Sequence, residues 1–376
     1  MRIGIDYTAA ARQGAGIGRY TRGLIGALPV LDGKNSYRLF VAGRGVGRRQ
    51  LDAPNFRTCW VPLTDRETAI LWQRLRLPVP VELFLGPLDL FHSPDFVLPA
   101  LLTRRTVLTV HDLSFLRVPE CAHPWLRQYL ARVVPRSVHR ASLVLADSEC
   151  TRDDVVELLQ VPRERVKVLY PGVEAHFQRV TDEDVLQAAR QRFGLLRPFI
   201  LGVSTLEPRK NFLGLIEAYA RLIERRHLPH ELLIVGRRGW LYEPIFRRVK
   251  ELGLGERVRF PGFVADDDLP VIYSLADCFA YPSFYEGFGI PILEAMSCGV
   301  PVVASKASSV PEVAGPAAIY VDPHDVESIV DALDRVLHDK DLRASLRRAG
   351  DQQARQFTWE KAGRRLLAAY QAVMSM

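Results

Sequence analysis

The chain of 376 residues lacks the features that mark membrane-spanning, disulfide-bonded or zinc-bound proteins. No stretch reaches the 18 or so uncharged apolar residues that a transmembrane helix needs. The five cysteines are scattered and include no Cys-x-x-Cys pair, which favours a reducing compartment and argues against disulfides or structural zinc. Residues 1–7 are typical of a strand carrying an acid, so a signal peptide is not expected. The sequence therefore predicts a cytoplasmic protein.

Motifs for several familiar chemistries are also missing. We find no D-x-D flanked by an apolar strand, no H-E-x-x-H, no EF-hand loop, no P-loop G-K-[ST] and no G-x-S-x-G. We therefore expect no metal and no other cofactor. There is no helix-turn-helix, zinc-finger or RNP signature either, so nucleic acid is not expected as a partner.

What the chain does have is an alternation of β-branched apolar runs with amphipathic stretches of helical length, repeated in two series. Strands are expected at 2–7, 37–42, 88–92, 106–111, 142–147 and 166–170, and again at 199–203, 231–235, 258–260, 278–281, 301–304 and 318–321. Helices are expected at 18–28, 125–140 and 150–159, and then at 211–226, 244–252 and 326–337. The alternation predicts an α/β protein with two doubly wound, Rossmann-like domains, 1–172 and 173–356. Ligands of such domains bind at the carboxyl ends of the strands, in a cleft between the domains.

The segment 285–294 reads as a polar binding site. Glu286 and Glu294 lie eight positions apart and bracket a turn that contains Gly287 and Gly289. Glycines let a ligand approach the backbone closely, and a helix beginning near Ile290 would present its N–H groups to an anion. Carboxylates accept hydrogen bonds from hydroxyls, so the ligand would carry both phosphate and several hydroxyls. The alternative is a helix start with one acid in its first turn, which explains Glu294 alone.

Two adjacent cations, Arg209 and Lys210, follow the first strand of the second series. Arginine grips phosphate oxygens in a bidentate way, and lysine acts as a point charge. The pair would neutralise a departing diphosphate at a metal-free site. The alternative is a solvated helix start, but cations there oppose the helix dipole, so an anion between them explains the pair better.

The first domain carries two weaker signals. A glycine loop, 14–19, with Gly16 at its centre, follows the first strand; a flexible loop and a ligand-covering loop explain it about equally. His111 falls at the carboxyl end of a strand, where a functional and a structural histidine are about equally expected.

Together, these residues resemble the retaining glycosyltransferases of family 4, which have the GT-B fold. The resemblance covers essentially the whole chain, and its specific part is the E-x7-E pattern with G-F-G-x-P inside it. It implies transfer of a sugar from a GDP- or UDP-linked donor to a glycan or lipid-linked acceptor, in cell-surface polysaccharide biosynthesis and with the anomeric configuration retained. Because the glycine loop lacks the lysine of starch and glycogen synthases, it looks closer to the mannosyltransferase-like group of bacterial polysaccharide enzymes.

The resemblance also implies roles for single residues. Arg209 and Lys210 would bind the donor diphosphate, Glu286 the hydroxyls of the donor sugar, and Glu294 the ribose. The remaining implied contacts are Gly16 with the leaving phosphate, His111 with the sugar, Phe288, Gly289 and Ile290 with the sugar through their backbone, and Phe263 and Val264 with the base. The last helix, within 357–376, would pack back on the first domain.

Three rival functions stay open at this point. A nucleotide-sugar 2-epimerase of the same fold would release nucleotide without an acceptor. A non-catalytic protein would bind the nucleotide sugar without turnover. A phosphorylase would require a pyridoxal-bearing lysine that we cannot identify.

Residues 1–172, the half assigned to the acceptor, carry a net charge of +8, whereas the rest of the chain carries −1, which together give +7. Arg44, Arg48, Arg49, Arg74 and Arg76 flank a Pro-rich apolar segment, 77–87. One hypothesis is a peripheral enzyme that docks on the anionic inner face of the membrane. The equal alternative is that the arginines are scattered and the apolar segment is buried.

Overall fold

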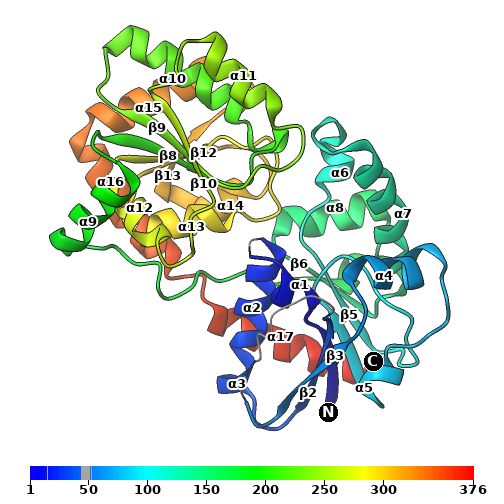
Figure 1. Cartoon of the computed structure of the whole chain (residues 1–376). Coiled ribbons are helices and arrows are strands. Elements are labelled where there is room, and N and C mark those ends of the chain that lie inside the picture. The colour runs from blue at the N-terminus through cyan, green and yellow to red at the C-terminus, as the bar shows by residue number, and fades with distance from the viewer. Residues whose placement is uncertain (15, 44–50, 52) are drawn as a thin grey trace. The chain divides into compact units, whose positions relative to one another are not determined.

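The computed structural model describes residues 1–14, 16–43, 51 and 53–376. The chain folds into two compact units (Figure 1). Unit 1 comprises Met1–Leu113, Gln128–Gly172 and Thr358–Met376, and unit 2 comprises Ser114–Arg127 and Val173–Phe357. The short segment Ser114–Arg127 is tied to unit 2 by Trp240, whose indole N–H donates to the Cys121 carbonyl at 2.8 Å.

Unit 1 is built on a seven-stranded parallel sheet with the order β3-β2-β1-β4-β5-β6-β7. The strands are β1 (Arg2–Asp6), β2 (Ser36–Ala42), β3 (Phe56–Val61), β4 (Leu90–Ser93), β5 (Thr106–Val110), β6 (Leu143–Ala146) and β7 (Val166–Val168). The order reverses between β1 and β4, the topological switch point at which doubly wound sheets bind ligands. Because all strands are parallel, their carboxyl ends share one edge of the sheet.

Helices cover both faces of this sheet, as its buried parallel strands require. The helices of unit 1 are α1 (Thr8–Arg12), α2 (Ile17–Gly26), α3 (Leu28–Leu31), α4 (Asp65–Ala69), the π-helical turn η1 (Ile70–Arg74), α5 (Glu82–Leu85), α8 (Glu149–Leu159), the 3-10 turn η3 (Arg163–Arg165) and α17 (Trp359–Met374). The long helix α7 (Pro124–Arg140) enters unit 1 from Gln128 onward.

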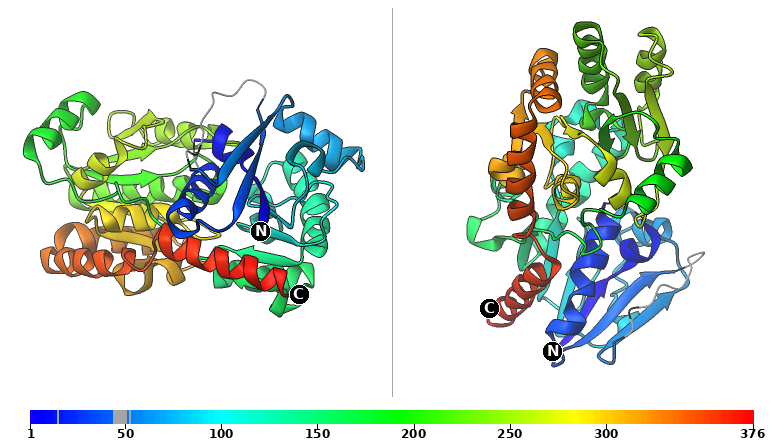
Figure 2. Two further views of the ribbon diagram at one scale, coloured as in Figure 1. Left: turned by 90° about the horizontal axis from the view of Figure 1, so that it is seen from below. Right: turned by 90° about the vertical axis from the view of Figure 1, so that its left-hand side faces the viewer.

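The last helix, α17, is part of the unit 1 core although it follows unit 2 in the sequence (Figure 2). Leu366 and Tyr370 of α17 are fully buried in one apolar cluster with Leu24 of α2 and with Ile3 and Ile5 of β1. Residues at the two ends of the chain thus complete one core.

Unit 2 is a second parallel sheet, of six strands, with the order β10-β9-β8-β11-β12-β13. Its strands are β8 (Phe199–Val203), β9 (Glu231–Val235), β10 (Val258–Gly262), β11 (Cys278–Tyr281), β12 (Val302–Ser305) and β13 (Ala318–Val321). Its helices and 3-10 turns are α6 (Ser114–Arg117), η2 (Pro119–Cys121), α9 (Glu183–Phe193), η4 (Pro208–Lys210), α10 (Phe212–Arg226), α11 (Glu243–Glu251), α12 (Leu269–Leu275), α13 (Ile290–Ser297), α14 (Val310–Ala314), η5 (Gly315–Ala317), α15 (Val326–His338) and α16 (Lys340–Ala354). The switch point lies between β8 and β11.

Two doubly wound parallel sheets confirm the predicted fold class. Several elements were not predicted, among them strand β3, helix α16, and helix α1, which precedes the expected glycine loop 14–19. The β3 strand is paired only with β2, and its residues are mostly half-buried, so its apolar alternation is weak. Helix α16 is largely polar, and its buried residues are few.

Candidate active site

A charged cluster lies at the switch point of unit 2. Arg209 and Lys210 belong to the 3-10 turn η4 after β8, and Glu286 follows β11, the neighbouring strand. The parallel sheet therefore brings to one edge two motifs that are 76 residues apart in the sequence.

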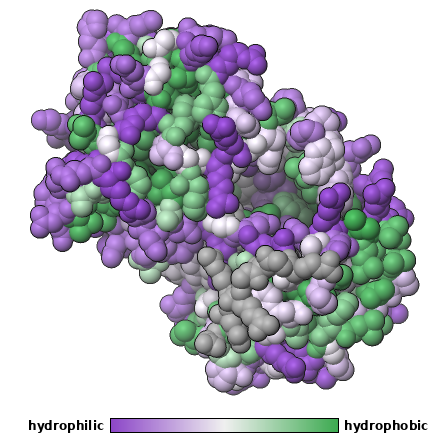
Figure 3. All heavy atoms as spheres, viewed as in Figure 1, coloured by the Kyte–Doolittle hydropathy of each residue, from purple (hydrophilic) through white to green (hydrophobic). Residues whose placement is uncertain are grey.

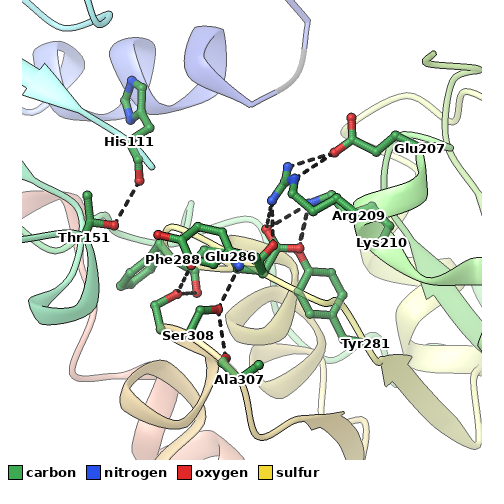
Figure 4. A network of polar contacts seen from close by, with 12 residues as sticks. His111, Thr151, Glu207, Arg209, Lys210, Tyr281, Glu286, Phe288, Ala307 and Ser308 are labelled. Carbon is green, nitrogen blue, oxygen red and sulfur yellow. Dashed lines mark hydrogen bonds and ion pairs between the residues drawn. The ribbon is translucent and has the colours of Figure 1, made fainter. Parts of the chain in front are cut away.

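Glu286 is the anion between the two cations (Figure 4). The Lys210 Nζ lies 2.7 and 2.9 Å from the two carboxylate oxygens, and Arg209 Nη1 lies 2.9 Å from Oε2. All three side chains are mostly buried, with exposed fractions of 15% for Arg209, 9% for Lys210 and 6% for Glu286. The predicted pair of cations is thus neutralised within unit 2 by the predicted sugar-binding carboxylate.

The electrostatics of this cluster keep Glu286 ionised. Burial would raise the pKa of its carboxyl, but the charges of Lys210 and then Arg209 outweigh burial and lower the pKa to about 2. Tyr281, whose hydroxyl lies 3.4 Å from Lys210 Nζ, has its pKa raised by burial and by the Glu286 charge, so it stays a neutral phenol. The site therefore presents an ionised carboxylate next to two cations.

Two residues of the same motif were given no role by sequence reasoning. Glu207 is almost fully buried and forms an ion pair with Arg209 at 2.8 Å, which orients the guanidinium from the side opposite Glu286. Asn211 adopts a left-handed conformation with φ 54° and caps α10 through its side-chain oxygen. Its amide nitrogen donates to the carbonyls of Pro282 and Pro323, which ties the loops after β8, β11 and β13 together. The ion pair could have been predicted from the sequence, because Glu207 lies two positions before Arg209 in the same motif.

The glycine-rich turn is held by two serines from the loop after β12. Ser309 Oγ, which is fully buried, donates to the carbonyls of Glu286 and Phe288 at 2.9 and 3.1 Å. Ser308 Oγ accepts from the Glu286 N–H at 2.8 Å. Gly289 has φ 103° and begins α13, a conformation that L-residues rarely adopt. These hydrogen bonds therefore hold the predicted backbone segment of Phe288, Gly289 and Ile290 in place, and this role of the two serines was not predicted.

The second glutamate of the pattern, Glu294, lies inside unit 2. It is fully buried in α13 and accepts a hydrogen bond from the Tyr273 hydroxyl of α12 at 2.9 Å. We expected it in the first turn of the helix, but α13 begins at Ile290, so Glu294 is its fifth residue. The Tyr273 contact was not foreseen.

The predicted base-framing residues follow β10, the edge strand of the sheet. Val264 is buried, whereas the Phe263 ring is 48% exposed and carries the Arg237 guanidinium 4.1 Å above its centroid. β10 lies two strands away from β8 in the sheet order, so this exposed ring is on the same carboxyl edge as the charged cluster, farther along.

In unit 1, His111 follows β5 and lies between two acceptors. Its Nδ1 is 2.7 Å from Asp147 Oδ2, and its Nε2 is 2.9 Å from the Pro94 carbonyl. A neutral imidazole donates from one nitrogen only, so two hydrogen bonds to acceptors require the imidazolium. Burial lowers the pKa of His111, but Asp147, Asp95 and the Pro94 carbonyl outweigh it and raise the pKa to about 9. His111 is therefore positively charged at neutral pH, which argues against a role as a general base.

Gly16 precedes α2, the helix that reaches the same edge of unit 1. Its φ of 52° explains the glycine, since a side chain would have open space but a strained backbone. From α2, the Tyr20 ring packs edge-on against the His111 ring, with centroids 4.7 Å apart. The fold thus brings the start of this helix and the end of β5 together.

Neither a metal cluster nor a membrane span emerges from the described residues. In that part of the chain no group of three or more His, Cys, Asp or Glu side chains is arranged to hold a metal ion. Among the same residues, every helix is too short or too polar to cross a bilayer.

Comparison with known proteins identifies the family. Residues 14–177 match the family model described as Glycosyltransferase Family 4, and residues 187–353 match Glycosyl transferases group 1. The O-antigen chain mannosyltransferase B of Escherichia coli is 36% identical over 282 residues, which cover 75% of this chain and 74% of that protein. The chain is a member of glycosyltransferase family 4. A serotype-specific mannosyltransferase, WbdA of E. coli, is 29% identical over 260 residues, but the glycosyltransferase spans only about a third (32%) of its length.

Solved structures agree with this assignment at the level of fold. The sucrose-phosphate synthase of Thermosynechococcus elongatus superposes with a TM-score of 0.80 at 21% identity, over 100% of the glycosyltransferase and 99% of that chain. Anabaena HepE, determined with UDP and glucose, gives a TM-score of 0.75 at 22% identity and 99% coverage of both chains. These identities are low, so the similarity establishes the GT-B fold alone.

Proposed function

We propose that the glycosyltransferase is a retaining, metal-independent enzyme that moves mannose from a GDP- or UDP-linked donor to a glycan or lipid-linked acceptor. The observation that carries the proposal is the Arg209–Glu286–Lys210 cluster at the switch point of unit 2. The choice of mannose is supported by the O-antigen mannosyltransferases among the relatives. A role in cell-surface polysaccharide biosynthesis is supported by the same relatives.

Within this proposal, each residue of the donor unit has one task. Arg209 and Lys210 bind the donor diphosphate, and Glu286 accepts hydrogen bonds from the sugar, with the backbone of Phe288, Gly289 and Ile290 beside it. Glu294 binds the ribose. Further contacts are assigned to Phe263 and Val264 with the base, to Gly16 with the leaving phosphate and to His111 with the sugar.

The chemistry proposed is departure and attack on one face of the sugar. The bond between the anomeric carbon and the diphosphate oxygen breaks, and the acceptor oxygen bonds to that carbon on the same face. The acceptor proton passes to the departing diphosphate. The protein then contributes by positioning the reactants and by stabilising the charge that leaves.

Incubation with labelled nucleotide sugars tests the proposal. The purified protein is supplied with GDP-mannose, UDP-glucose and related donors, with and without methyl glycosides or lipid extracts as acceptors. We expect a labelled glycoside or glycolipid and one equivalent of free nucleotide. Nucleotide release that needs no acceptor and yields an epimerised sugar would instead support the epimerase alternative, and binding without turnover would support the non-catalytic one.

The tasks assigned to the two glutamates are tested separately. Glu286→Gln is expected to lower turnover more than affinity for the bare nucleoside diphosphate, because this carboxylate is assigned to the sugar. Glu294→Gln is expected to weaken nucleotide binding, because it is assigned to the ribose. Calorimetry with GDP and UDP measures both affinities, and a stronger loss in Glu286→Gln would reverse the assignment.

We also propose that unit 1 docks on an anionic membrane. The segment that follows η1 is divided: Val81 and Leu85 are buried, whereas Leu77, Leu83 and Phe84 are exposed. In Figure 3, apolar side chains gather over the part of the surface where Figure 1 shows α4. Exposed arginines and two further exposed leucines lie near this segment in the sequence: Arg74, Leu75, Arg76, Leu102, Arg104 and Arg105. Three arginines that we also predicted to flank the segment, Arg44, Arg48 and Arg49, lie outside the described residues.

Co-sedimentation with liposomes measures this docking. Binding is expected to rise with the fraction of phosphatidylglycerol and to fall with salt, because each cation near the surface contributes about 1 kcal/mol and is screened. Leu83→Ser with Phe84→Ser should reduce binding, whereas exchange of the exposed Val185 of unit 2 for Ser should not. Equally weak binding to anionic and neutral vesicles at low salt would exclude docking.

A further inference from the structure

The switch point of unit 1 carries, beside His111, three carboxylates that have no function assigned so far. Asp6 ends β1, Asp95 follows β4, His111 follows β5 and Asp147 follows β6, and these strands are consecutive neighbours in the sheet. Asp6 and Asp95 flank the reversal of strand order, as Lys210 and Glu286 do in unit 2. Ligands of doubly wound sheets bind at such a reversal.

Asp95 differs from its neighbours, because its carboxylate has no polar partner among the described residues. Asp6 Oδ1 accepts from the Thr8 N–H at 3.0 Å, and His111 is shared between Asp147 and Pro94. By contrast, no hydrogen bond or ion pair joins the partly buried Asp95 carboxylate to any residue in the described part of the chain. Nearby, Asp147 is 5% exposed, and its Oδ1 is buried without a partner among the same residues. A buried acceptor without a partner, such as Asp147 Oδ1, is costly unless a ligand or water supplies a donor, whereas the Asp95 carboxylate is partly exposed and therefore accessible to a ligand.

The backbone around Asp95 is pinned on both sides. His111 Nε2 holds the Pro94 carbonyl at 2.9 Å, and the Phe96 N–H donates to the Thr109 carbonyl at 3.0 Å. Ser93 Oγ donates to the Val97 carbonyl at 2.6 Å. Phe96 has φ 40°, a strained value for a non-glycine residue, and such strain gathers at functional sites. The loop therefore holds Asp95 in a preorganised position, and the hydrogen bond from His111 to Pro94 is one of the contacts that fix the loop.

We propose that Asp95 binds the acceptor. Its carboxylate accepts a hydrogen bond from a hydroxyl of the acceptor sugar, to which the donor sugar is transferred. The inference rests on the proposed function and extends it to unit 1. A carboxylate is suited to a neutral, polyhydroxylated acceptor, because it offers four acceptor positions and no donor. Burial raises the pKa of Asp95 above its usual value, and the charge of His111 offsets only part of this rise. His111 is then a positioning residue for Asp95.

The chain offers a matched control for this assignment. Asp89 precedes β4 and Asp95 follows it, so the two carboxylates lie at opposite ends of one strand. Asp89 pairs with Arg2 at the amino edge, away from the switch point. Asp95→Asn and Asp89→Asn each replace a carboxylate by an amide of the same shape.

The experiment measures acceptor and donor dependence separately. The donor is the nucleotide sugar that the wild type uses, and the acceptors are methyl glycosides of mannose, glucose, galactose and N-acetylglucosamine. For Asp95→Asn we expect the acceptor KM to rise about 10- to 100-fold, as loss of a hydrogen bond to a charged group implies, with the donor KM unchanged. Transfer of the sugar to water should persist, and Asp89→Asn should match the wild type in both KM values.

Two outcomes would overturn the inference, and they are distinguishable. If the wild type turns over but Asp95→Asn keeps its acceptor KM and kcat within about twofold, the assignment of Asp95 alone fails. If the wild type releases no nucleotide from any nucleotide sugar, the proposed function fails and this inference with it. Asp95→Ser, assayed in the same way, replaces Asp95→Asn if circular dichroism shows that the amide variant is unfolded.

Discussion

The charge balance at Glu286 changes the interpretation of the neighbouring cations. From the sequence, Arg209 and Lys210 were expected to hold an anion between them, and in unit 2 that anion is the Glu286 carboxylate. Glu207 adds a second carboxylate on Arg209. Four alternating charges hold one another in place, so the site is preorganised before a donor arrives.

Removal of either cation should impair turnover strongly. Arg209→Ala and Lys210→Ala are each expected to lower kcat/KM by about two orders of magnitude or more, because each takes a preorganised charge from the leaving diphosphate. Arg192→Ala is the control, since Arg192 forms an exposed ion pair with Asp268 in the same unit. Near wild-type rates in both single variants would contradict the diphosphate assignment, and thermal melting curves show whether the variants are folded.

The imidazolium of His111 should make the stability of unit 1 depend on pH. Its pKa is raised to about 9, against about 6.5 in the unfolded chain. A histidine whose pKa is raised by folding stabilises the folded state fully at pH values below the pKa of the unfolded chain. This stabilisation is lost as the pH rises through the pKa of the folded state. The free energy of unfolding should therefore fall between about pH 6.5 and 9.

Urea denaturation of the wild type and of His111→Gln at several pH values measures the effect. The difference between their unfolding free energies should shrink across that window. His139→Gln, an exposed histidine in the unit 1 part of α7, should follow the wild type. Parallel pH profiles for the wild type and His111→Gln would show that no charge is held at this position.

Among the helices, the contact between α2 and α17 depends on glycine. A Cβ on Gly23 would come within 2.2 Å of the Trp359 ring, and one on Gly363 would meet Leu31 at 2.6 Å. Because these two glycines have no side chain, α17 can pack closely on α2 and α3. Neither glycine has a left-handed backbone, so close packing, and not turn geometry, explains them.

Adding one methyl group at this contact should destabilise unit 1. Gly23→Ala is expected to cost about 1–3 kcal/mol of unfolding free energy, because it overpacks the interface. Gly26→Ala is the control in the same helix, since its Cβ would meet nothing within 4 Å, and it should be neutral or slightly stabilising. Urea denaturation of the two variants gives both values, and equal stability would show that α17 does not pack tightly on α2.

For the whole enzyme, the charges supplied by the protein predict how it responds to chelators. Arg209 and Lys210 provide the positive charge that a metal ion would otherwise supply to the diphosphate. Activity should therefore persist in EDTA at the rate measured without it. A complete loss of labelled product in EDTA, restored by Mg²⁺ or Mn²⁺, would contradict the proposal.

Much of the architecture follows from local patterns in the chain. The β-branched runs, the amphipathic stretches and the E-x7-E turn are read from neighbours a few positions apart, and the two parallel sheets follow from their alternation. The family resemblance rests on the same short motifs. Strand β3 and helix α16 were not predicted from the sequence because their apolar patterns are weak.

The contacts that define the sites come from tertiary packing. Lys210 meets Glu286 across 76 positions, His111 meets Asp147 across 36, and His92 meets Tyr370 of the last helix across 278. The same packing determines that Glu286 neutralises the cations, that His111 is charged and that the Asp95 carboxylate has no partner in the described part of the chain. Burial and charge depend on which distant strand ends become neighbours, and strand order, unlike strand identity, is set by how the whole chain packs.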